Sequence, residues 1–219
     1  MATSVPNHGS RGSSIQVKHV LWVVFGLMTL FVIWRRDSTL LDSHSFLRQR
    51  YAPIPWLMML HGIPGALALC LGVFQFSDRL RRRYLAVHRI VGRIYVGCVL
   101  ISAPLAIAVS IALADPILLP ATIIQSTVWV ATTGTGLYCA RTGKIQQHKE
   151  WMIRSYPMAM VFIFVRTIGE IPAIARMGLI GVHTVVWSCI AVACFLPSFL
   201  ISWQALGASR RVVKARAAA

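Results

Sequence analysis

The sequence predicts an all-α integral membrane protein, a helical bundle of about six transmembrane helices. Two observations support this fold class. Of the 219 residues, 57% are hydrophobic and 13% are charged, whereas charged residues make up about a quarter of an average soluble domain. Long apolar segments also recur between short polar or basic joints, and a hydrocarbon core about 30 Å thick requires such segments.

The transmembrane segments are expected at 19–34, 55–76, 90–114, 117–140, 155–174 and 178–206. The first segment is short, as a signal anchor would be. Because Arg35 and Arg36 follow it in place of a small-residue cleavage site, we expect it to remain in the mature protein. The chain then divides into a disordered tail (1–18), a single membrane domain (19–206) with a core at 55–174, and a basic tail (207–219).

The basic residues predict the orientation of these segments. With six spans both termini lie on one side of the membrane, and most of the 22 lysines and arginines lie there, in the tails and in the joints around RLRRRYLAVHR and RTGKIQQHKEWMIR. The positive-inside rule therefore predicts cytoplasmic termini. The joints and the anionic lipid headgroups beside them explain the net charge of +16, so we do not expect nucleic acid as a partner. Arginine-rich joints without transit-peptide character favour a bacterial inner membrane.

A first group of polar residues falls inside the spans, in the outer half of the membrane. Arg166 and Glu170 lie about 17 Å and 23 Å along the fifth segment, and four residues apart on one helix face they are expected to pair. His61 lies about 9 Å below the start of the second segment, and Gln125 and His183 lie at similar depths. Ionisable groups in lipid are costly, so we predict that this layer lines a ligand site or, alternatively, fastens neighbouring helices.

A second group is expected at the cytoplasmic surface of the membrane. His88 begins the third segment in YLAVHRIVGRIY, and His148 precedes the fifth in QQHKEWMIRSY. These histidines either anchor their helices or belong to a second site. Residues expected beside them are Arg89, Arg93, Arg154, Trp151, Tyr84, Tyr95 and Tyr156.

Three ordered blocks, HGIPGALALCLGVFQF, LRRRYLAVHRIVGRIYV and HKEWMIRSYPMAMVFIFVR, carry a family resemblance. They resemble a multi-pass membrane family described as domain of unknown function 2306, over residues 61–166. The resemblance implies a fold and a membrane location but no reaction. It adds Gln75 to the cytoplasmic-face candidates. The family's marks fall on His61, Gln75, His88, Arg89, Gly92, Arg93, Tyr95, His148, Trp151, Met152, Arg154 and Arg166.

A looser similarity is to transmembrane b-type cytochromes, in which histidines on facing helices hold haem. Such a site needs two neutral imidazoles at matching depth. The pairs that satisfy this condition are His61 with His183 and His88 with His148. The similarity implies haem b as a cofactor.

The function predicted from these observations is that of a small redox or ligand-binding membrane protein. The sequence contains no nucleophile elbow, Walker loop or HExxH motif, so whether it is an enzyme stays open. In this hypothesis Arg166 neutralises an anionic or carbonyl-bearing molecule such as a quinone or haem, His61 exchanges a proton with it, and Glu170 holds Arg166. One alternative is a non-catalytic membrane interaction module. Another is a small-solute transporter with helices broken at Pro64, Pro104, Pro120, Pro157, Pro172 and Pro197.

Overall fold

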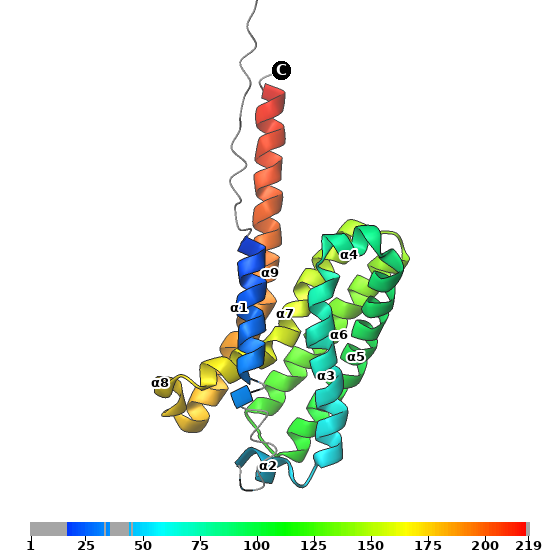
Figure 1. Cartoon of the computed structure of the whole chain (residues 1–219). Helices are drawn as coiled ribbons and strands as arrows, with labels where there is room; N and C mark the ends of the chain where they lie inside the picture. The colour runs from blue at the N-terminus through cyan, green and yellow to red at the C-terminus, as the bar shows by residue number, and fades with distance from the viewer. Residues whose placement is uncertain (1–16, 33, 36–43, 45, 218–219) are drawn as a thin grey trace, which may run out of the picture.

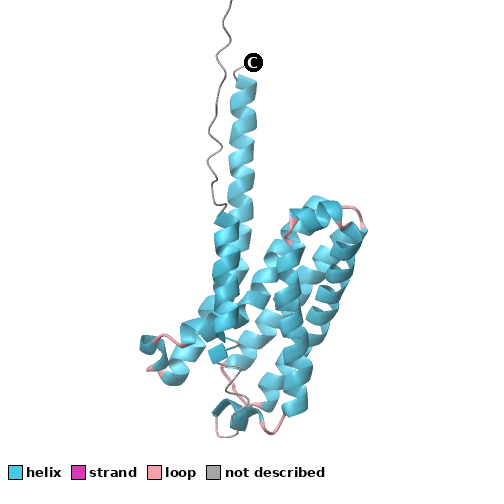
Figure 2. Cartoon of the chain, in the orientation of Figure 1, coloured by secondary structure: helices cyan, strands magenta, loops and turns pink. Residues whose placement is uncertain are grey.

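The computed structural model describes residues 17–32, 34–35, 44 and 46–217, which form helices and connecting turns without a strand. The long helices are α1 (Val17–Val32), α3 (Pro55–Gln75), α5 (Leu85–Ala112), α6 (Leu118–Arg141), α7 (Ile145–Gly169) and α9 (Gly178–Ala217). The short helices are α2 (Phe46–Tyr51), α4 (Asp78–Arg83) and α8 (Pro172–Ala175). The predicted all-α class is confirmed (Figure 2).

Helices α3, α5, α6 and α7 form a bundle, and α1 and α9 pack against α7. α3 packs against α5, α5 against α6 and α6 against α7, while α7 also contacts α1 and α9. The start of α1, helix α4 and the end of α9 lie at one end of the molecule, called here the α4 end (Figure 1). Helix α2 and the α5–α6 turn lie at the other, the α2 end. The long helices therefore alternate in direction, as a multi-pass bundle requires.

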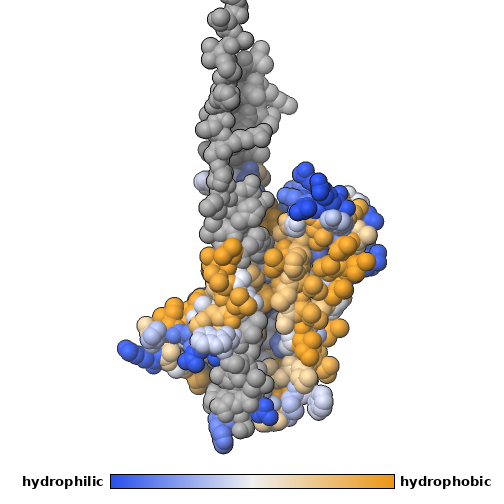
Figure 3. All heavy atoms as spheres, viewed as in Figure 1, coloured by the Kyte–Doolittle hydropathy of each residue, from blue (hydrophilic) through white to orange (hydrophobic). Residues whose placement is uncertain are grey.

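The surface and the helix lengths fit a membrane protein. Among the described residues, three helices are long and apolar enough to cross a membrane: α3, α5 and the part of α9 that covers Gly178–Leu206. Helices α6 and α7 have similar lengths, but their polar side chains, including Ser126, Thr133 and Ser155, are buried inside the bundle. Apolar side chains cover much of the visible bundle, and hydrophilic ones gather over α4 (Figure 3).

The ends of helix α7 differ from those of the fifth expected transmembrane segment, 155–174. Helix α7 begins at Ile145, because the polar run IQQHKEWMIR is helical although it is not apolar. It ends at Gly169, and Glu170 is its C-cap. Ile171 then adopts an extended conformation, as expected for a residue that precedes a proline.

The expected helix breaks at prolines are mostly absent. Helices α3, α5, α7 and α9 continue through their internal prolines, which are Pro64, Pro104, Pro157 and Pro197. Pro120 lies in the first turn of α6, where a proline has no helical hydrogen bond to remove. Of these six prolines, Pro172 alone, which begins α8, follows an interruption between described helices. This removes most of the support that the transporter hypothesis drew from prolines.

Two tyrosines expected at the membrane surface lie in the core instead. Tyr95 is 1% exposed and Tyr156 is 3% exposed. The Tyr156 hydroxyl donates to the Leu69 carbonyl oxygen at 2.9 Å, which joins α7 to α3. The Tyr95 hydroxyl lies 2.9 Å from Ser155 Oγ and accepts from Trp129 Nε1 at 3.3 Å. Because both phenols have hydrogen-bond partners on neighbouring helices, they do not need the polar membrane surface.

Candidate ligand-binding site

A cavity of about 310 Å³ lies between α3, α5, α6 and α7, and its lining extends to residues at the α2 end. This volume is at the lower limit of typical small-molecule pockets, which measure about 300–1,000 Å³. Three of the five residues predicted for the outer polar layer line it: His61 from α3, Gln125 from α6 and Arg166 from α7. Side chains far apart in sequence therefore converge on one space.

Helix α5 fixes the orientation of His61. His61 Nδ1 lies 2.9 Å from the Ser102 carbonyl oxygen, and Ser102 Oγ donates to the His61 carbonyl oxygen at 2.9 Å. A carbonyl oxygen only accepts, so Nδ1 carries the proton and the neutral ring keeps its lone pair on Nε2. Gly65 permits this close approach, because a Cβ there would lie 3.0 Å from Ser102 Oγ. The cavity thus contains an imidazole with a defined tautomer.

Gln125 and Arg166 form the opposite polar wall. Gln125 Nε2 donates to the Met158 carbonyl oxygen at 3.0 Å, which ties α6 to α7. The Arg166 guanidinium carbon lies 3.5 Å from the centroid of the Phe162 ring, a cation–π contact one helical turn away. Helical side chains lean toward the N-terminus of their helix, so Arg166 leans toward Phe162.

The expected pair between Arg166 and Glu170 is not formed among the described residues. Glu170 Oε2 lies 3.8 Å from Arg35 Nε, beyond the end of α1. Glu170 is the C-cap of α7, and Arg166 leans toward Phe162, in the direction of the helix N-terminus. The role of Glu170 in holding Arg166 in place stays a prediction.

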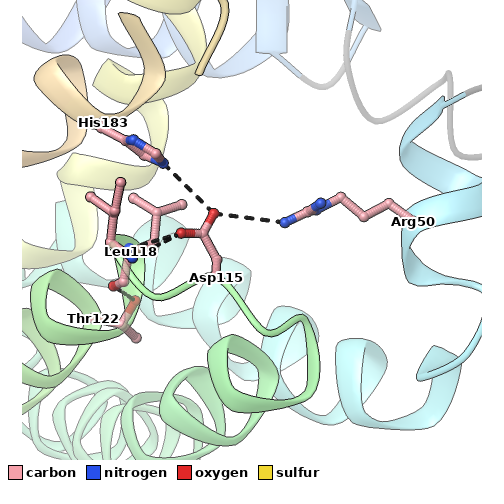
Figure 4. Close-up of polar contacts among 6 residues, drawn as sticks. Arg50, Asp115, Leu118, Thr122 and His183 are labelled. Atoms are coloured by element: carbon pink, nitrogen blue, oxygen red, sulfur yellow. Dashed lines mark hydrogen bonds and ion pairs between the residues drawn. The ribbon is translucent and has the colours of Figure 1, made fainter. Parts of the chain in front are cut away.

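His183 contacts an acidic residue at the α2 end of the cavity (Figure 4). His183 Nε2 and Arg50 Nη2 lie 3.7 Å and 3.8 Å from Asp115 Oδ2. Asp115 Oδ1 accepts from the backbone amides of Ile117 and Leu118 at 3.2 Å and 3.0 Å, at the start of α6. Arg50 and Asp115 line the cavity. The imidazole of His183 thus faces Asp115, which the haem hypothesis did not expect.

The surroundings of Asp115 determine its protonation. Burial acts to raise the pKa of its carboxyl group, but the amides of Leu118 and Ile117 and the neighbouring His183 outweigh this effect, so the pKa lies below its ordinary value. The carboxylate is thus kept ionised where the α5–α6 turn meets α2 and α9.

Asp115→Asn is expected to lower thermal stability at neutral pH, because the amide loses the ion pair with Arg50 and weakens the contact with His183. A carboxyl group with a lowered folded-state pKa stabilises the fold above its unfolded-state pKa, near 4, and loses this effect as pH falls through the folded value. The difference in melting temperature between wild type and Asp115→Asn should therefore shrink below about pH 4. Melting curves in detergent from pH 7 to pH 3 would measure it, with the exposed Asp78→Asn as control. A difference that stays constant down to pH 3 would contradict this account.

The sequence interpretation missed several polar residues of the lining beside the three it found. Ser102, Ser110, Asp115 and Arg50 also line the cavity, and Ser110 Oγ is buried without a hydrogen-bond partner among the described residues. A usable signal was present in α5, where Ser102, Ala106 and Ser110 are spaced by four and so share one helix face. Asp115 gave no signal, because the sequence places it in a joint.

The cytoplasmic-face candidates lie toward the α4 end, but they do not form one cluster. Arg89 and Arg93 are exposed on α5. Arg154 Nε donates to Ser198 Oγ at 3.2 Å, which ties α7 to α9. The Arg154 guanidinium also lies 5.1 Å from the ring of Trp151 on its own helix. Tyr95 belongs to the core, as described above.

The other three candidates at this end, Gln75, His88 and His148, lie at the ends of their helices. His148 Nδ1 donates to the Gly136 carbonyl oxygen at 2.8 Å, which defines its tautomer as it does for His61. His148 lies close enough to His88 for the two rings to interact electrostatically. Among the described residues, no three side chains of His, Cys, Asp or Glu come close enough to hold a metal ion.

Comparison with known proteins identifies the family. A family model described as predicted membrane protein (DUF2306) matches residues 58–205, which include α3 to α7 and most of α9. No curated protein and no solved structure matches the chain. The match is longer than the resemblance predicted over residues 61–166, because it also includes Glu170 and His183. The looser similarity to b-type cytochromes stays a prediction. The chain belongs to the family of predicted membrane proteins described as DUF2306.

Proposed function

We propose that the cavity binds a small molecule that presents carbonyl or carboxylate oxygens, and that quinones are the class it suits best. One observation carries this proposal: His61, Gln125 and Arg166, from three different helices, line the same cavity. Polar residues inside a membrane bundle are costly and are most often retained for a function. Guanidinium and amide N–H groups donate to carbonyl oxygens, and an imidazole such as His61 does so from Nε2 when its ring is protonated.

The rest of the lining supports an apolar ring system with polar oxygens at its edge. Leu69, Ala106, Trp129 and Val161 supply apolar walls, and an aromatic ring packs well against indole. Arg166 would donate to a carbonyl or carboxylate oxygen of the ligand. The His61 Nε2 lone pair would accept a proton from the hydroxyl group of a reduced quinol, and the protonated ring would return one to the oxygen of a reduced quinone. The more specific form of this proposal is that the quinone is oxidised or reduced while it is bound.

The membrane setting is also part of the proposal. We place the protein in a bacterial inner membrane with both termini in the cytoplasm, because the basic joints lie at the α4 end, where α1 begins and α9 ends. The basic side chains of α4 would then contact anionic lipid headgroups. The cavity, whose lining reaches the α2 end, would lie in the outer half of the bilayer.

Two measurements on detergent-purified protein test the proposal. A titration with a short-chain ubiquinone should raise the melting temperature until the site saturates, and no shift at any soluble concentration would contradict quinone binding. Absorption spectra before and after dithionite test the haem alternative. A Soret band with sharp α and β bands on reduction, lost in His61→Ala or in His88→Ala, would replace the quinone proposal with haem and identify the end that holds it.

A further inference from the structure

Two polar atoms at the α4 end are buried without a hydrogen-bond partner among the described residues, Gln75 Nε2 and His88 Nδ1. Gly92, one turn after His88 on the same face of α5, makes room for Gln75, since a Cβ at Gly92 would lie 3.2 Å from Gln75 Oε1. A buried polar atom without a partner is costly. Two such atoms at the same end of the molecule indicate a ligand.

The charges around these atoms are positive. Arg81 and Arg89 act electrostatically on His88. The Asp78 carboxylate is already hydrogen-bonded to Arg81. Helix α4, which has the sequence DRLRRR, places further arginines beside the site, and Figure 3 shows the hydrophilic patch that they form. The groups that lack partners are thus surrounded by excess positive charge.

We infer that Gln75, His88 and His148 form a second site, separate from the cavity, that binds a net-negative phosphate group. A phosphate oxygen can accept from the Gln75 amide and from an imidazole N–H, while nearby arginines supply charge. His148 has its Nδ1–H committed to the Gly136 carbonyl oxygen, so it would donate to a phosphate oxygen only from Nε2 of the protonated ring. The phosphate belongs either to an anionic lipid headgroup or to a soluble molecule.

Thermal melting of the purified full-length protein in neutral detergent tests this inference. The probes are phosphatidylglycerol, phosphatidylcholine as the lipid without net charge, and inorganic phosphate. The variant Gln75→Met/His88→Phe removes both atoms and should weaken binding about tenfold or more, because hydrogen bonds to charged groups are strong. Its melting temperature without probe should not fall, since neither atom has a protein partner to lose. Gln146→Met removes an exposed amide that donates to Glu150 at the same end and is the matched control.

The outcomes separate the sources of the phosphate. A shift with phosphatidylglycerol alone, lost in the double variant and kept in the control, assigns a lipid headgroup site, whereas a shift with inorganic phosphate assigns a soluble ligand. Equal shifts in wild type and double variant, or no shift with either anion, overturn the inference. If the double variant does not fold, Gln75→Glu replaces it, because a carboxylate in almost the same volume should repel phosphate. Retained binding in Gln75→Glu would overturn the inference equally.

Discussion

Gly72→Ala is expected to destabilise the protein by about 1–3 kcal/mol, the usual cost of forcing extra volume into a packed core. In a helix this substitution ordinarily stabilises by about 0.5–1 kcal/mol, so the expected sign is reversed here. A Cβ at Gly72 would overlap Cε2 of Tyr156 and lie 3.2 Å from Cε2 of Tyr95. Both rings are almost fully buried, and the Tyr156 hydroxyl is bonded to Leu69 on the same helix as Gly72, so neither ring has space to move away.

Thermal melting in detergent would measure this effect. Gly97→Ala on α5 is the matched control, because a Cβ there has no contact within 4 Å, and it should be neutral or stabilising. The double variant Gly72→Ala/Tyr156→Leu removes the overlapping ring, so it should be less destabilised than the sum of its single variants. If Gly72→Ala melts at the same temperature as Gly97→Ala, helices α3 and α7 do not pack through the Tyr156 ring.

Hydropathy predicted the fold class well and the helix ends unevenly. The expected segment at 55–76 agrees closely with α3, and that at 117–140 agrees with α6, because in both cases the apolar run and the helix end together. In α7 they do not. Hydropathy reports transfer into lipid, whereas the helix continues for as long as backbone hydrogen bonds form, so the polar first turns of α7 escaped prediction. The short basic helix α4 escaped for the same reason.

Only part of the candidate site was predicted, because the depth of a residue in the membrane does not define the direction of its side chain. Counting residues along each span placed His61, Gln125 and Arg166 at matching depths, and the structure brings these three together. The same count also included Glu170 and His183, which meet Arg35 and Asp115 instead. The direction in which a side chain leaves its helix depends on how the helices pack, and one sequence does not contain that information for an isolated polar residue.

Arg166→Leu is expected to weaken binding of a short-chain ubiquinone by about tenfold to a hundredfold, because it removes a charged donor to a ligand carbonyl oxygen. Arg166→Lys should give an intermediate affinity, since lysine keeps the charge but not the planar fork of donors. Melting-temperature titrations of each variant would measure the affinities.

Arg154→Leu is the matched control for Arg166→Leu. It removes the same charge from the same helix, but its contacts are with Ser198 and Trp151 rather than with the cavity. It should lower stability modestly and leave ubiquinone affinity unchanged. Equal losses of affinity in the two variants would mean that the arginines act through the fold or through net charge. A loss confined to Arg166→Leu would mean that the guanidinium meets the ligand, since a merely structural role of Arg166 would lower the melting temperature without changing the concentration at which ubiquinone saturates the site.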